Sequence, residues 1–169
     1  MAAHLPGLLQ AAGASSTAAI AAASLVGPAQ VAARIVEFGL LRSFHPIPLA
    51  RLASALHPIG AAFLVILGPP GLIAFALLHG AGNGMITIAK GTLPLAVFGP
   101  QGYGRRSGLL SAPARTVQAA APFLFGLLLD AAGSGAVALS AGLCLAAFGS
   151  LFLLRPRRAV ATQASAIRG

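Results

Sequence analysis

Long apolar runs, separated by short polar or Gly/Pro-rich links, make up most of this chain. Each run holds about 20 residues, which is the length that a helix needs to cross the hydrocarbon core of a bilayer. The runs are rich in Ala and Leu and lack the alternation over about ten residues that a membrane β-strand shows. The pattern therefore predicts an all-α, polytopic transmembrane helix bundle. We expect five full spans, at residues 14–41, 47–67, 72–91 (with an apolar extension to 98), 109–129 and 136–154.

The links between these runs carry turn and capping signals. The sequence Ala-Ser-Ser-Thr at 14–17 offers an N-cap for the first span. The sequence Gly-Pro-Pro-Gly at 68–71 predicts a tight turn, and we expect residues 99–107 to form the longest polar loop.

The first 12 residues are apolar but too short to span a bilayer as a helix. They lack the basic start and the longer apolar middle of a secretory signal, since the first Lys or Arg is Arg34. We expect this segment to be the end of a longer helix, and a short interfacial segment is the alternative. The expected organisation is a six-helix unit at 1–155 with an incomplete first helix, followed by a cytoplasmic tail at 156–169.

Composition agrees with a membrane protein. Hydrophobic residues make up 57% of the chain and charged residues only 8%, whereas a soluble domain carries roughly 25% charged residues. The net charge of +9 would suggest a nucleic-acid partner only if a basic face could be built on a soluble body, and this composition excludes that. We therefore expect a lipid bilayer, and no nucleic acid, as a partner.

Links with and without basic residues alternate along the chain, and this pattern predicts the orientation of the chain in the membrane. Lys and Arg gather on the cytoplasmic side of membrane proteins. Here all 11 of them lie near the first link, near the third link or in the tail, and the turns at 68–71 and 131–135 hold none. This distribution predicts a multi-pass protein of the inner cell membrane with a cytoplasmic C-terminus.

Polar residues inside the runs recur at helical spacing. A residue of this kind is costly in lipid and usually faces protein or water. Three such stripes occur, namely Gln30, Arg34 and Glu37; His79, Asn83, Thr87 and Lys90; and Ser111, Arg115, Gln118 and Pro122. The run at 136–154 has only Ser140, Cys144 and Ser150, and we expect it to face lipid or to pack as a support.

From the stripes we predict a solute pathway lined by Gln30, His79, Asn83, Arg115 and Gln118. We predict an inner gate or salt bridge made by Arg34, Glu37 and Lys90. The alternatives are interhelical hydrogen bonds for the amides, and snorkelling to the interface for Arg115. For His57 and His79, a role in proton transfer and a plain hydrogen bond to a neighbouring helix are both open. The spacing of Gly80 and Gly84 predicts a helix-contact surface.

The sequence predicts no enzyme, metal site or cofactor. The four His residues are scattered, and the two carboxylates, Glu37 and Asp130, are expected near opposite membrane faces. The Gly-rich segment at 99–108 lacks the Lys-Ser/Thr pair of a phosphate-binding loop.

Three segments resemble the C-terminal half of a major facilitator superfamily transporter. They are Gly27-Pro-Ala-Gln-Val-Ala-Ala-Arg34, Gly80-Ala-Gly-Asn-Gly84, and Pro122-x-x-x-Gly126-x-x-x-Asp130-x-x-Gly133. The resemblance covers about residues 1–155. It implies that residues 1–12 end helix seven of a twelve-helix protein, and that the full spans are helices eight to twelve. In that family, helices seven, eight, ten and eleven of this half line the pathway.

Two departures accompany the resemblance. The family's loop between helices eight and nine often pairs an acidic residue with a basic run, and here only Arg34, Glu37 and Arg42 stand near it. The N-terminal half is missing, which implies a fragment, a truncated product or a half that pairs with a separate N-terminal half.

The expected function is thus that of a secondary active transporter half that moves a small-molecule solute by alternating access. The alternative is a membrane-embedded structural or assembly subunit without transport.

Overall fold

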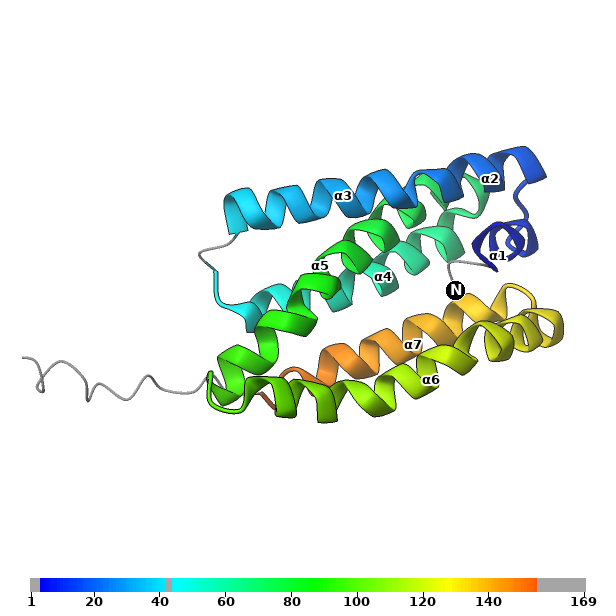
Figure 1. Ribbon diagram of the computed structural model, residues 1–169. Helices are drawn as coiled ribbons and strands as arrows, with labels where there is room; N and C mark the ends of the chain where they lie inside the picture. The colour runs from blue at the N-terminus through cyan, green and yellow to red at the C-terminus, as the bar shows by residue number, and fades with distance from the viewer. Residues whose placement is uncertain (1–3, 42–43, 155–169) are drawn as a thin grey trace, which may run out of the picture.

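The computed structural model describes residues 4–41 and 44–154, and within them the chain is helical without strands. The elements are α1 (Leu5–Ala11), α2 (Ser16–Ser24), α3 (Val26–Val36), a π-helical turn (Glu37–Leu41), α4 (Pro46–Leu67), a 3-10 turn (Pro69–Gly71), α5 (Leu72–Phe98), α6 (Tyr103–Ala132) and α7 (Gly135–Ser150) (Figure 1). The all-α prediction is confirmed. The predicted tail at 156–169 lies outside the described residues.

Among the described residues, four helical segments are long and apolar enough to cross a membrane. They are Ser16–Leu40, Pro46–Leu67, Pro69–Phe98 and Tyr103–Ala132. Four such segments indicate a multi-pass membrane protein, but the predicted count of five full spans is not confirmed. The difference lies in α7, which has 16 residues and ends at Ser150, because the apolar residues after it form a turn rather than a further helical turn.

The predicted long loop at 99–107 is wrong, because α6 begins at Tyr103 and leaves only 99–102 as a link. Gly99 and Gly102 have φ angles of 76° and 63°, which reverse the chain sharply where other residues would be strained. The Tyr103 hydroxyl then donates a hydrogen bond to the Gly91 carbonyl at 2.9 Å, and Arg106 donates one to the Phe98 carbonyl at 2.8 Å. Both bonds tie the start of α6 to the end of α5.

The first span begins as predicted. Ser15 has an extended backbone, and its hydroxyl accepts a hydrogen bond from the Ala18 backbone N–H at 3.2 Å, so Ser15 is the N-cap of α2. The regular helix is interrupted only at Leu25, α3 begins at Val26, and α2 and α3 together form one span.

Glycines let α5 approach its neighbours on two sides. A Cβ atom at Gly80 would lie 2.7 Å from the Val26 carbonyl oxygen, and one at Gly84 would lie 2.6 Å from that of Gln30, so both glycines face α3. Gly82 faces α4, where a Cβ atom would lie 2.8 Å from the Ala53 carbonyl oxygen. The predicted contact surface of Gly80 and Gly84 is confirmed.

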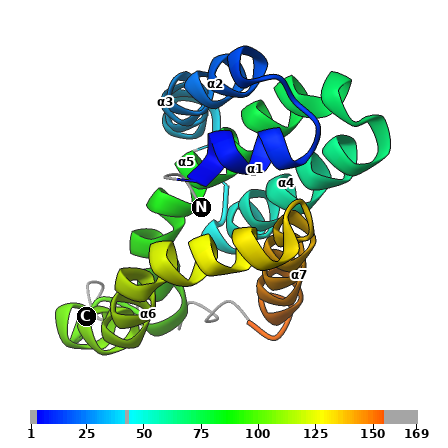
Figure 2. The ribbon, with the colours of Figure 1, turned by 90° about the vertical axis from the view of Figure 1, so that its right-hand side faces the viewer.

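The helices form a bundle in which α4 packs against α5 and α7, and α3 covers α5 (Figure 1). The largest fully buried side chains, Leu8, Leu9, Phe75 and Val137, gather at the end where α1 lies. Helix α6 leans away from this core (Figure 2). Its later part contacts α1, where His4 Nε2 lies 2.9 Å from the Pro122 carbonyl oxygen.

Five of the six described Lys and Arg residues lie toward one end of the bundle, and the sixth, Arg115, is near the middle of α6. Arg34 is near the end of α3, Arg51 near the start of α4, Lys90 in the last third of α5, and Arg105 and Arg106 near the start of α6. Figure 1 shows these helix ends together, opposite the end that holds α1. The orientation of this end toward the cytoplasm stays a prediction.

Candidate functional site

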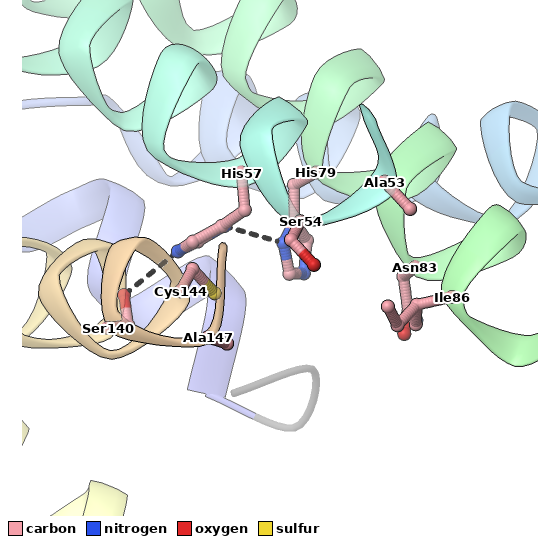
Figure 3. A pocket seen from close by; sticks show the side chains of 10 residues that line it. Ala53, Ser54, His57, His79, Asn83, Ile86, Ser140, Cys144 and Ala147 are labelled. Atoms are coloured by element: carbon pink, nitrogen blue, oxygen red, sulfur yellow. Dashed lines mark hydrogen bonds between the residues drawn. The ribbon is translucent and has the colours of Figure 1, made fainter. Parts of the chain in front are cut away.

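A cavity of about 230 Å³ lies between α4, α5 and α7. Its polar lining consists of Ser54, His57, His79, Asn83, Ser140 and Cys144 (Figure 3). His57 stands near the middle of α4, 11 residues after Pro46 and 10 before Leu67, which places it about 15 Å from either helix end. The cavity therefore brings several polar side chains together near the middle of helices that are otherwise apolar.

His57 joins the three helices by hydrogen bonds. Its Nδ1 lies 2.9 Å from Nδ1 of His79 on α5, and its Nε2 lies 3.0 Å from the hydroxyl oxygen of Ser140 on α7. Figure 3 shows His57 between these two partners. The Ser140 hydroxyl also donates to the Val137 carbonyl at 2.9 Å. Since a hydroxyl has one proton, Ser140 accepts from His57 while it donates to Val137.

Aromatic packing fixes the two imidazoles. The Phe75 ring is fully buried and stacks on His79, with centroids 5.7 Å apart and planes 11° from parallel. It also lies 5.7 Å from the His57 ring. The two imidazoles meet edge to face at 4.9 Å. This packing holds both rings in the orientation that their hydrogen bond requires.

Pro58 leaves one backbone carbonyl of α4 without its usual helical donor. It stands inside α4 and has no backbone N–H, so the Ser54 carbonyl, four residues earlier, loses its usual helical donor. The Ser54 hydroxyl donates a hydrogen bond to the Ala50 carbonyl at 2.9 Å.

The five predicted pathway residues fall in three places. His79 and Asn83 line the cavity together, one helical turn apart on α5. Gln30 is half-buried on α3, where its backbone packs against Gly84. Arg115 and Gln118 are exposed on α6, so the structure does not bring them to the cavity.

The middle of α6 is exposed on all sides, and one of its faces is polar. Every residue from 108 to 120 is exposed. Gln118 is at the midpoint of this helix, 15 residues after Tyr103 and 14 before Ala132. Arg115 follows Tyr103 by 12 residues, or about 18 Å along the helix. The polar face and the cavity are two separate sites.

The predicted gate residues are not joined to one another. Across residues 4–41 and 44–154, no ion pair links Arg34 to Glu37, although Nε of Arg34 and Oε2 of Glu37 are both buried without a hydrogen-bond partner. Glu37 is 4% exposed and begins the π-helical turn. Lys90 lines a neighbouring cavity of about 230 Å³. A gate role for these residues stays a prediction.

Sequence reasoning did not place His57 and Ser140 in one site. The run that became α7 was expected to face lipid or to act as a support, yet Ser140 on this helix closes the hydrogen-bond chain. The sequence signal that pointed to this site was His57 in the middle of a predicted span, followed by Pro58, which leaves a backbone carbonyl without its helical donor. Its partner on another helix could not be found from spacing within one helix.

Comparisons with family models, curated proteins and solved structures find no match. Functional inference therefore rests on the two sites. Within the described part of the chain, no group of three or more His, Cys, Asp and Glu side chains is placed to hold a metal ion.

Proposed function

We propose that the chain is the C-terminal half of a secondary active transporter of the major facilitator type, working with a second, N-terminal half to move a small solute by alternating access. In this proposal it is a multi-pass protein of the inner cell membrane with a cytoplasmic C-terminus. The observation that carries the proposal is the polar, exposed face of α6, formed by Arg115 and Gln118.

The free-energy cost of placing a charged side chain in lipid argues that this face does not contact lipid. A charged side chain near the centre of a bilayer costs at least about 2.5–3.5 kcal/mol. Helix α6 is 30 residues, or about 45 Å, long, and Arg115 and Gln118 stand within four residues of its midpoint. A face of this kind is stable in a membrane when it contacts water or another protein surface.

The remaining packing supports the same assignment. His4, which precedes α1, contacts the later part of α6. The Tyr103 hydroxyl bonds the beginning of α6 to α5. Its middle is left open to a further surface. Alternating access requires a second bundle that rocks against the first around a central site. The open face of α6 fits the surface that such a bundle and the solute would share.

The test is cysteine labelling of α6 in a background where the native Cys144 is replaced by Ala. Gln118→Cys lies on the polar stripe, and Ala120→Cys lies at almost the same depth about 200° around the helix. In detergent-free membranes opened to both sides, a water-soluble maleimide should label Gln118→Cys several-fold faster than Ala120→Cys. Equal, slow labelling of both would overturn the pathway assignment and favour a structural subunit whose polar residues serve packing.

A further inference from the structure

We propose that the His57–His79 pair binds one proton in the middle of the membrane and exchanges it with the cavity through His79. This site stands on its own geometry. Its assignment as the coupling-ion site rests on the proposed transporter function, in which the coupling ion is then the proton.

The hydrogen bonds define a direction along the chain. Ser140 donates its proton to the Val137 carbonyl, so His57 must donate from Nε2 to Ser140. A neutral imidazole carries one N–H, so Nδ1 of His57 is an acceptor and His79 donates to it from Nδ1. In this arrangement both imidazole rings are neutral, and each hydrogen bond of the chain contains one proton.

One ring nitrogen is left to take up a proton. Three of the four ring nitrogens are used in the bonds above, and Nε2 of His79 has no hydrogen-bond partner among residues 4–41 and 44–154. His79 lines the cavity. A proton from water in the cavity forms an N–H bond at this Nε2 and leaves an imidazolium at His79, without breaking any existing bond.

The positive charge then moves from His79 to His57 without the help of another group. The Nδ1–H bond of His79 breaks and an Nδ1–H bond forms on His57, across 2.9 Å, so the imidazolium is now His57. Beyond His57, the Ser140 hydroxyl donates to the Val137 carbonyl, and this carbonyl has no proton of its own to release to a further group. The proton therefore stops at His57 and leaves by the way it came, which makes the pair a store rather than a through-going wire.

The same geometry limits the pair to one added proton. If both rings were imidazolium, each Nδ1 would carry an N–H, and the two donors would point at each other across 2.9 Å. Phe75 stacks on His79, and the face of an aromatic ring attracts a cation. The site thus suits a single positive charge.

In the described part of the chain, one ionisable side chain besides the pair lines the cavity. Cys144 on α7 is the further ionisable side chain in this cavity. Arg51 on α4 bonds to the Leu151 carbonyl at 3.1 Å and lies over the Phe152 ring. In the described part of the chain, the other ionisable groups of the elements packed on α4 and α5 line no part of this cavity; they are His4, Arg34, Glu37, Lys90, Tyr103, Arg105, Arg106, Arg115 and Asp130.

Protonation would act on helix contacts, because the bonds of His57 join α4 to α5 and to α7. A charge that moves between His79 and His57 changes the strength of both contacts. This gives the proton a direct effect on the packing of three helices, which is what coupling to a conformational change needs.

The test is nuclear magnetic resonance of the purified chain in lipid nanodiscs, with ¹⁵N in the four His side chains. We expect a scalar coupling between the two Nδ1 atoms, and uptake of one proton by the two rings together between about pH 9 and pH 4. Assignment uses His79→Gln and His45→Gln.

Three results would overturn the site: absence of the Nδ1–Nδ1 coupling, uptake of no proton over this pH range, or uptake of one proton by each ring independently. None of them needs transport, so the site and the function fail separately. If the coupling and the single proton are found but Gln118→Cys stays unlabelled, the proton site stands and the transporter proposal falls. The wild-type measurement does not depend on how well any variant folds.

Discussion

The sharpest prediction concerns Gly84, where α5 touches α3. A methyl group added here meets three backbone atoms of Gln30, at 2.6, 3.0 and 3.2 Å, so no side-chain rotation relieves the contact. Ordinary contact begins at 3.4 Å, so α3 must move by about 0.8 Å along the closest direction. Overpacking of this size costs typically 1–3 kcal/mol. Relative to a Gly→Ala change at an open helical position, Gly84→Ala should therefore lower the free energy of unfolding by about 1–3 kcal/mol.

The assay is unfolding in mild detergent by added dodecyl sulfate, followed by circular dichroism. Gly142→Ala is the matched control, because a Cβ atom at Gly142 on α7 meets nothing within 4 Å in the described part of the chain. It should be neutral or stabilising by up to about 1 kcal/mol, since Ala favours a helix over Gly. If both variants unfold alike, the close α3–α5 contact is not formed in the folded protein.

Three further substitutions test single bonds by the same unfolding assay. Ser15→Ala removes the N-cap of α2 and should cost about 1 kcal/mol, with Ser16→Ala unchanged within error as its control. Tyr103→Phe removes the hydroxyl bond that ties α6 to α5 and should cost about 0.5–1.5 kcal/mol; no change would mean that this link adds nothing. Ser140→Ala removes the acceptor of His57 and should cost about 0.6–1.7 kcal/mol, whereas Ser140→Thr, which keeps a hydroxyl, should cost less.

Much of the fold could be predicted from local pattern. The apolar runs gave the helices, because a 20-residue apolar segment has few other stable states in a bilayer. The N-cap at Ser15 and the packing role of Gly80 and Gly84 also follow from residue type and spacing. These features depend on neighbours within one helix, and the sequence displays them directly.

Features that depend on contacts between distant segments were missed. The start of α6 at Tyr103 depends on Gly102 having a positive φ and on a bond to Gly91, and neither is visible in a polar, Gly-rich stretch. The chain from His79 through His57 to Ser140 depends on the register of three helices, which single-helix periodicity does not contain.

The most direct test of the transporter proposal is whether one residue of α6 can be reached from both sides of the membrane. The residue is Gln118→Cys in the Cys144→Ala background, labelled with a membrane-impermeant maleimide in sealed right-side-out and inside-out vesicles. Alternating access predicts labelling from both sides, with a rate from each side that changes when the vesicles are shifted in pH. Labelling from neither side, with Ala120→Cys equally unreactive, would contradict the proposal.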